Sequence, residues 1–209
     1  MSSRADILGA IRLNRPQLER PLPAVPLFDG APPPSLLAAF KDSVQGMGGL
    51  FLDPPASGDP FAPVRLKIAD AKVVCSTVPE IGGNRNIADV RAPQDLADVD
   101  FAIVRASFAV AETGSVLLSE ANLFINAVAY LAQHLIVLLD PADIVVNLHH
   151  AYRRPEFRDR RYAAFHTGPS ATADIEGVLI HGAQGVRSLS VLPIARATGR
   201  STQSLETTA

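Results

Sequence analysis

The sequence is poor in the residues that mark several classes of protein. Among its 209 residues there is one cysteine, Cys75, and no tryptophan. A single cysteine excludes an intrachain disulfide, a cysteine zinc knot and a cysteine-ligated iron–sulfur cluster within these residues. Because such a composition suits a reducing compartment, we expect a cytoplasmic protein.

Charge of one sign is also scarce, since the net charge is −2 and charged residues make up 19% of the chain. This balance gives no general attraction to nucleic acid or acidic lipid. Residues 152–162 hold five arginines, and we interpret them as a solvated, partly ion-paired loop in preference to an RNA contact. We expect no metal site, because His149 and His150 lack the i, i+4 spacing of a helical metal pair.

Long apolar runs are missing too. The most apolar window, residues 123–139, is interrupted by Asn126, Gln133 and His134, so we predict no membrane-spanning segment. The first 15 residues lack the apolar core and cleavage site of a signal peptide.

Apolar residues make up 47% of the chain, which is typical of a globular protein. We divide it into a helix and proline-rich arm over 1–34, an α/β domain over 35–196 and a flexible tail over 197–209. The arm is expected to lie on the domain or on a partner. An oligomer stays open.

The hydrophobic pattern alternates between strands and helices. Strands are predicted at 50–52, 72–76, 101–105, 108–111, 116–118, 134–139, 162–166 and 188–194. Helices or helical turns are predicted at 3–13, 35–46, 62–70, 93–97, 141–151 and 172–180, while 122–132 stays open between helix and loop. This order predicts an α/β fold whose sheet is mostly parallel, with helices on both faces.

A polar insert, Glu112 to Ser115, interrupts the apolar run 104–118. Buried polar groups are costly unless they are hydrogen-bonded or used. We therefore take Glu112, Thr113, Gly114 and Ser115 as the floor of a pocket. Glu112 is either a partly buried nucleophile or general base, or a group that only hydrogen-bonds the backbone at a strand crossover.

A second polar break runs from Gly168 to Gly177. Its Ser170 or Thr172 could cap the helix predicted at 172–180, whose free N–H groups would attract a phosphate or carboxylate. For Asp174 we favour a structural capping role. We expect both breaks to close on each other as one cavity beyond the carboxyl ends of the strands.

Several stretches resemble the LUD-domain family, and within it the lactate utilization protein C group. They are AETGSVLL at 111–118, the strand that begins at His134, GPSATADIEGVLIHGAQG at 168–185 and the opening SSRADILGAIR at 2–12. The resemblance covers nearly the whole chain. It implies the Rossmann-like fold of the sugar-phosphate isomerase and CoA-transferase superfamily.

The resemblance also implies a role in oxidising L-lactate to pyruvate beside partner proteins that carry iron–sulfur clusters, with a small anionic metabolite as ligand and no intrinsic cofactor. The family's motif residues fall on Glu112, Thr113, Gly114, His134, Gly168, Pro169, Ser170, Thr172, Asp174 and Glu176. Gln184 stands where the family usually shows a histidine, in Gly-Ala-Gln-Gly-Val at 182–186. An amide can position a ligand but cannot exchange protons as imidazole does.

Two other functions stay open. One is an acyl- or CoA-transferase with Glu112 as nucleophile, and the other is a metabolite-binding module without catalysis.

Overall fold

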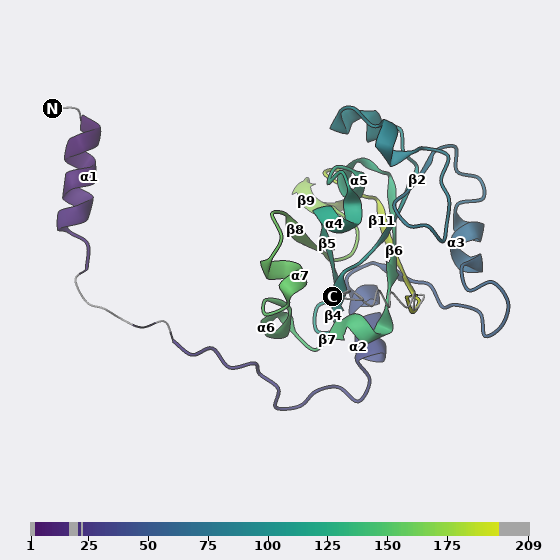
Figure 1. The fold of residues 1–209 in the computed structure, drawn as a ribbon, viewed down its shortest axis with the longest axis horizontal. Helices are drawn as coiled ribbons and strands as arrows, with labels where there is room; N and C mark the ends of the chain where they lie inside the picture. Colours follow the sequence, from purple (N-terminus) through teal and green to yellow (C-terminus); the bar gives the residue numbers. More distant parts are fainter. Residues whose placement is uncertain (1–2, 17–20, 22, 197–209) are drawn as a thin grey trace, which may run out of the picture.

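The computed structural model describes residues 3–16, 21 and 23–196, so the predicted tail at 197–209 lies outside the described residues. Figure 1 shows a compact body from which the first helix stands apart at the end of an extended arm. That helix, α1 (Ser3–Leu13), confirms the predicted span and buries none of its residues.

A five-stranded sheet forms the centre of the body. Its strand order is β1-β11-β6-β3-β2, and every neighbouring pair is parallel. The strands are β1 (Leu50–Phe51), β2 (Val74–Ser76), β3 (Phe101–Arg105), β6 (His134–Leu139) and β11 (Ser188–Pro193). The predicted parallel α/β sheet is confirmed, and the bounds of β3 and β6 are as expected.

Apolar side chains leave both faces of this sheet, because alternate residues of a strand point to opposite sides. On one face β6 contributes Ile136 and Leu138, which pack in one cluster with Val64 of α3 (Ala62–Lys67). On the other face the cluster includes Val137 and the buried Val44 of α2 (Leu36–Gly46). Ser35 caps α2 as predicted, accepting a hydrogen bond from the N–H of Ala38 at 3.2 Å.

A second sheet carries the polar insert. It has the order β7-β4-β5-β8 and is mixed: β4 pairs antiparallel with β5 and parallel with β7, and β5 pairs antiparallel with β8. The strands are β4 (Phe108–Val110), β5 (Ser115–Ser119), β7 (Ile144–Val145) and β8 (Ala163–His166). Because the insert joins the antiparallel neighbours β4 and β5, it forms the turn of a hairpin in this second sheet.

Short helices and turns connect these strands. They are η1 (Ile87–Asp89), η2 (Pro93–Leu96), α4 (Glu120–Leu123), α5 (Val128–Leu131), η3 (Pro141–Asp143), α6 (Leu148–Ala151) and α7 (Pro155–Arg158). The single helix predicted over 141–151 is wrong. The apolar run after Asp143 pairs with β4 as β7, and the Asn147 side chain then caps α6 by accepting from the N–H of His150.

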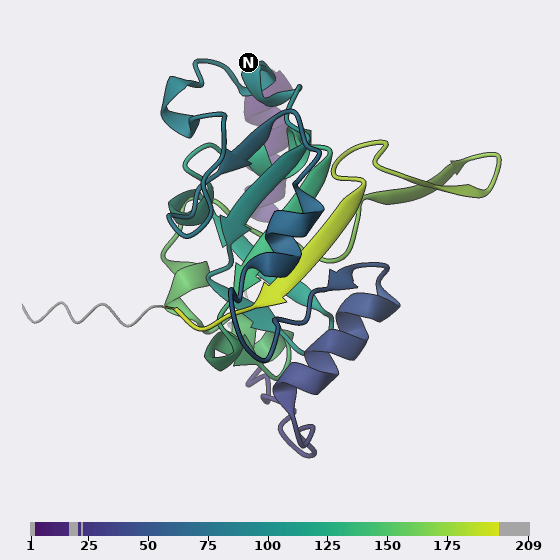
Figure 2. The same cartoon turned by 90° about the vertical axis from the view of Figure 1, so that its right-hand side faces the viewer.

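The helix predicted over 172–180 is also wrong. Residues of this stretch form the antiparallel hairpin β9 (Ala171–Ile175) and β10 (Val178–His181), which projects from the body (Figure 2). Glu176 and Gly177 connect the strands with φ values of 54° and 72°. Two positive φ angles in succession suit a two-residue hairpin turn and end any helix.

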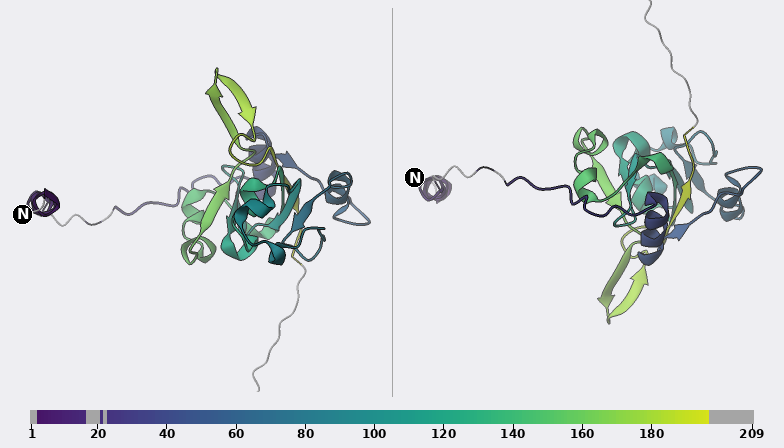
Figure 3. Two further views of the ribbon diagram at one scale, coloured as in Figure 1. Left: turned by 90° about the horizontal axis from the view of Figure 1, so that it is seen from above. Right: turned by 90° about the horizontal axis from the view of Figure 1, so that it is seen from below.

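The C-terminal part of the proline-rich arm contacts the body. Asn147 donates from Nδ2 to the carbonyl of Leu27 at 2.8 Å, and the Phe28 ring lies 4.6 Å from that of His149. This part of the arm therefore lies on the domain as expected, whereas α1 stands away from it in the views of Figures 1 and 3.

Candidate functional site

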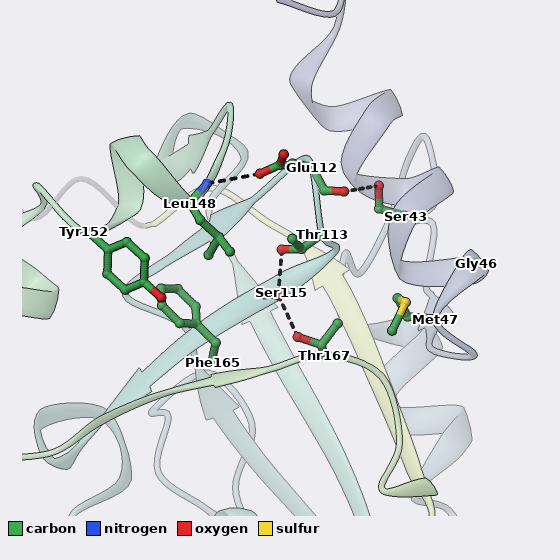
Figure 4. Close-up of a pocket in the computed structure, with 10 residues that line it drawn as sticks. All are labelled: Ser43, Gly46, Met47, Glu112, Thr113, Ser115, Leu148, Tyr152, Phe165 and Thr167. Atoms are coloured by element: carbon green, nitrogen blue, oxygen red, sulfur yellow. Dashed lines mark hydrogen bonds between the residues drawn. The ribbon is translucent and has the colours of Figure 1, made fainter. Parts of the chain in front are cut away.

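A pocket of about 760 Å³ opens beside the polar insert (Figure 4). Its lining residues come from α2, the β4–β5 hairpin, the segment of α6 and the end of β8. They are Ser43, Gly46, Met47, Glu112, Thr113, Ser115, Leu148, Tyr152, Phe165 and Thr167. None comes from the five parallel strands, so the pocket lies beside the second sheet. The expectation that the pocket would lie beyond the carboxyl ends of the parallel strands is therefore wrong.

Gly114 fixes the turn of the hairpin against α2. Its φ is +67°, and a Cβ added there would lie 2.5 Å from the backbone N of Val44. The Ser43 hydroxyl completes this contact by donating to the carbonyl of Ala111 at 2.8 Å. The turn therefore needs glycine for both its conformation and its closeness to the helix.

Three hydroxyl groups form a chain along the pocket (Figure 4). The Oγ of Ser115 lies 2.7 Å from Oγ1 of Thr113 and 2.6 Å from Oγ1 of Thr167. Ser115 is only 3% exposed, so these bonds satisfy a buried group. Because each hydroxyl can donate or accept, the two ends of the chain can turn toward a ligand's oxygen atoms.

Glu112 lies at the rim, and its side chain is exposed, which corrects the partial burial expected from the sequence. Its Oε2 accepts a hydrogen bond from the backbone N–H of Leu148 at 3.3 Å. The carboxylate thus contacts the first residue of α6, where negative charge is favourable. Of the two roles that the sequence left open for Glu112, this contact matches the hydrogen bond to the backbone.

The opposite wall is apolar and aromatic. Tyr152 and Phe165 lie next to each other in this wall in an edge-to-face contact, with ring centroids 6.0 Å apart and planes nearly perpendicular (Figure 4). Leu148 and Met47 add aliphatic surface. A small molecule with one apolar side and one oxygen-rich side would match this arrangement.

The second polar break adjoins the pocket only at its beginning. Thr167 lines the pocket, and Gly168 packs so tightly that an added Cβ would lie 2.2 Å from the Met47 carbonyl. Pro169 lies against Gly48. Beyond them the chain leaves the pocket lining, and Ser170 holds the base of the hairpin by donating its N–H to the Val186 carbonyl at 2.9 Å.

Thr172 and Asp174 lie on the projecting hairpin. The Thr172 hydroxyl donates to the Asp174 carboxylate at 2.6 Å. Neither residue lines the Glu112 pocket. The expectation of an anion site at a helix start near Ser170 or Thr172 is therefore wrong, because this segment is a hairpin and has no helix start.

His134 and Gln184 lie elsewhere again. His134 is the first residue of β6, at the amino edge of the parallel sheet, and its Nδ1 is 2.8 Å from the Ser188 hydroxyl. Gln184 lines a hollow of about 390 Å³ together with Gln133 and Arg187. The structure thus places these two residues around a second region, away from the polar insert.

Ser43, Tyr152 and Thr167 line the pocket without having been predicted. The alternation along β8, in which Phe165 and Thr167 share a face, was a signal for Thr167. Ser43 and Tyr152 come from distant helical segments, and nothing near them in the sequence marked them.

Within the residues that the structure describes, no three His, Cys, Asp or Glu side chains gather as a metal ion would require. No helix in that part of the chain is long and apolar enough to cross a membrane.

The LUD domain family matches residues 78–193, a stretch that holds the β4–β5 hairpin, β6 and the β9–β10 hairpin. The chain belongs to the LUD domain family. A crystal structure of a DUF162 family protein from Deinococcus radiodurans is similar to this LUD domain protein, with a TM-score of 0.56 and 17% identity. The likeness covers 75% of this chain and 94% of that chain, and it concerns the fold. No curated protein matches the chain.

Proposed function

We propose that this LUD domain protein is a cytoplasmic component of L-lactate utilization, of the lactate utilization protein C kind. It would act beside partner proteins that carry iron–sulfur clusters. The observation that carries the proposal is the family match over residues 78–193, which includes the whole polar insert. The family is associated with lactate utilization in general.

The pocket beside the insert supports a small-molecule role. Its hydroxyl chain can donate to the carboxylate or hydroxyl oxygens of a 2-hydroxy acid, and Phe165 and Leu148 offer apolar surface to the carbon chain. Glu112 is the single carboxylate in the lining. Because one cysteine cannot ligate an iron–sulfur cluster by itself, the proposal assigns any cluster for electron transfer to a partner.

A metabolite-binding role without catalysis is the second candidate. It is favoured by the exposed position of Glu112 and by its bond to the Leu148 N–H, which give this carboxylate a structural use. The third reading, acyl or CoA transfer through Glu112, requires the same oxygen atoms to attack an acyl carbon. A hydroxylamine-sensitive acyl-enzyme would support that reading.

Deletion of the gene and complementation with the full chain test the main proposal. We expect the deletion strain to lose growth on L-lactate and to keep growth on pyruvate, and the tagged protein to purify with iron–sulfur proteins. Normal growth of the deletion strain on lactate would contradict the proposal.

Variants test the role of Glu112 and of the hydroxyl chain. Glu112→Gln keeps an oxygen for the Leu148 N–H, so it restores growth on lactate if Glu112 is structural and fails if Glu112 is a nucleophile. Asp89→Asn, a change at an exposed carboxylate of η1, is the matched control and should restore growth fully. Ser115→Val blocks the centre of the hydroxyl chain and should reduce growth.

A further inference from the structure

A hollow of about 400 Å³ that His134 lines, distinct from the one that Gln184 lines, lies where the parallel strands begin. Its walls come from residues at the starts of neighbouring strands. Val74, Phe101, His134 and Ser188 occupy one row of the register across β2, β3, β6 and β11. Residues on or just before this row line the hollow, and the end of α3 closes one side. None of them lines the Glu112 pocket.

Three cations face this hollow. Lys67 comes from the end of α3, Lys72 from the approach to β2 and Arg187 from the approach to β11. Among residues 3–16, 21 and 23–196, the charged side-chain groups of these three residues make no ion pair within 4.0 Å and no hydrogen bond; the two side-chain bonds at Lys72, from Asn84 and Asp100, go to its backbone. Unpaired cations from three separate elements that converge on one hollow leave hydrogen-bond donors free for an anion.

Two carboxylates also line the hollow, so charge alone does not decide. Asp100 directs its Oδ2 to the backbone N–H groups of Lys72 and Val73, at 2.7 and 2.9 Å. Its charge is therefore engaged by the backbone at the start of β2. Asp70 is exposed, three residues beyond the end of α3. The three cations still exceed the two carboxylates in number.

His134 sits between these charges. Its ring stacks on Phe101 with centroids 4.8 Å apart, and Ser188 holds its Nδ1. Burial is the main cause that lowers the pKa of His134, repulsion from Lys67 and Arg187 adds to it, and Asp100 opposes it. An anion placed among the cations would reverse part of that repulsion and favour the imidazolium.

We propose that this hollow is an anion site for a phosphate-type dianion, held by Lys67, Lys72 and Arg187 with His134 as a further donor. Arg187 offers the planar fork that pairs with two oxygens of a phosphate, and the lysines add point charges. The hollow is large enough to hold a phosphate that is free or attached to a small metabolite. The inference is independent of the Glu112 pocket.

Calorimetry on the full chain tests the site with two probes, inorganic phosphate and glycerol 3-phosphate, against chloride at equal ionic strength. Saturable binding of either probe supports the site, and tighter binding of the ester identifies a phosphorylated metabolite as the source. Arg187→Gln should weaken binding by about tenfold or more. Arg91→Gln, at an exposed arginine before η2, is the matched control and should leave binding unchanged.

The imidazole signal of His134 gives a readout at the site itself. Sulfate remains a dianion throughout the titration, so an NMR titration in sulfate and in chloride compares the same charge state of the ligand. We expect sulfate to raise the pKa of His134 in the wild type and to have little effect in Arg187→Gln. Absence of binding by both phosphate probes, or a His134 pKa that is equal in sulfate and chloride, would overturn the proposal.

Discussion

The Glu112 pocket and the His134 hollow differ in size, charge and origin. The first, about 760 Å³, is lined by hydroxyl and aromatic side chains with one carboxylate and belongs to the second sheet. The second, about 400 Å³, is lined by three cations, two carboxylates and a histidine at the amino edge of the parallel sheet. Glu112 and His134, both positions that the resemblance assigns to the family's motifs, thus line two separate cavities with different charge.

The two regions also differ in how the backbone shapes them. At the Glu112 pocket a tight turn is held against a helix, while the residues of the His134 hollow come from the starts of parallel strands, the segments just before them and the end of α3. Substitutions that disturb one region should therefore leave the other intact, and the following predictions test this separation in order of decreasing effect.

Gly114→Ala should have the largest effect on stability. The new Cβ would meet the backbone of Ser43 and Val44 at 2.5–2.6 Å, in a conformation with φ +67°. Strain and overpacking together should lower the free energy of unfolding by about 4 kcal/mol in urea denaturation. Gly82→Ala, where no atom lies within 4 Å, is the control and should stay near wild type.

Low pH should destabilise the folded protein through His166, which follows Phe165 of the pocket wall in the sequence. His166 lies on β8 beside Thr167, its Nε2 is buried without a hydrogen-bond partner among the described residues, and burial lowers its pKa to about 4. The unfolded chain therefore binds a proton at His166 more tightly than the folded chain does. The contribution of neutral His166 to the free energy of unfolding is fully present above the ordinary pKa of about 6.5 and is lost as pH falls toward 4.

The expected loss from His166 is about 3 kcal/mol over that pH range. Urea denaturation at several pH values measures it. His166→Gln should flatten the pH dependence, and His181→Gln, at an exposed position of β10, should not. An equally steep dependence in His166→Gln would contradict this prediction.

Two buried serines, compared with each other, should show a smaller effect on stability. Ser115→Ala removes the centre of the hydroxyl chain and should lower the free energy of unfolding by about 1–2 kcal/mol. Ser190 is also buried, but its hydroxyl has no partner among the described residues, so Ser190→Ala should be neutral or stabilising. Equal effects of the two changes would show that the chain of hydroxyls adds nothing.

Glu112→Gln should have the smallest effect on folding. It keeps the hydrogen bond to the Leu148 N–H and loses only a surface charge beside a short helix, worth about 0.5 kcal/mol or less. Thermal unfolding of this variant beside wild type checks the value, and a large loss would mean that the carboxylate has partners not seen in this structure.

Much of the fold follows from the apolar pattern of the sequence. The strands at 101–105 and 134–139 and the helix at 3–13 were predicted with their observed bounds, because buried runs and amphipathic spacing are local signals. The prediction failed at 172–180, where possible caps at Ser170 and Thr172 suggested a helix but the positive φ angles at Glu176 and Gly177 turn the chain into a hairpin.

The candidate site was predictable only in part. The insert Glu112–Ser115 was visible because polar residues interrupt a buried run. The partners from α2 and α6, Ser43 and Tyr152, could not be found, because only the folded chain brings them to the insert. The grouping of His134 with Arg187 depends on strand order, which joins β6 and β11 across more than fifty residues of sequence.

An amide-resolved NMR titration of the full chain, with L-lactate and with inorganic phosphate at equal ionic strength, tests the separation of the two regions most directly. We predict that lactate shifts the amide signals of Thr113, Ser115 and Leu148, and that phosphate shifts those of Lys72, Gln133 and Arg187. Shifts from both ligands in one and the same region would contradict the account.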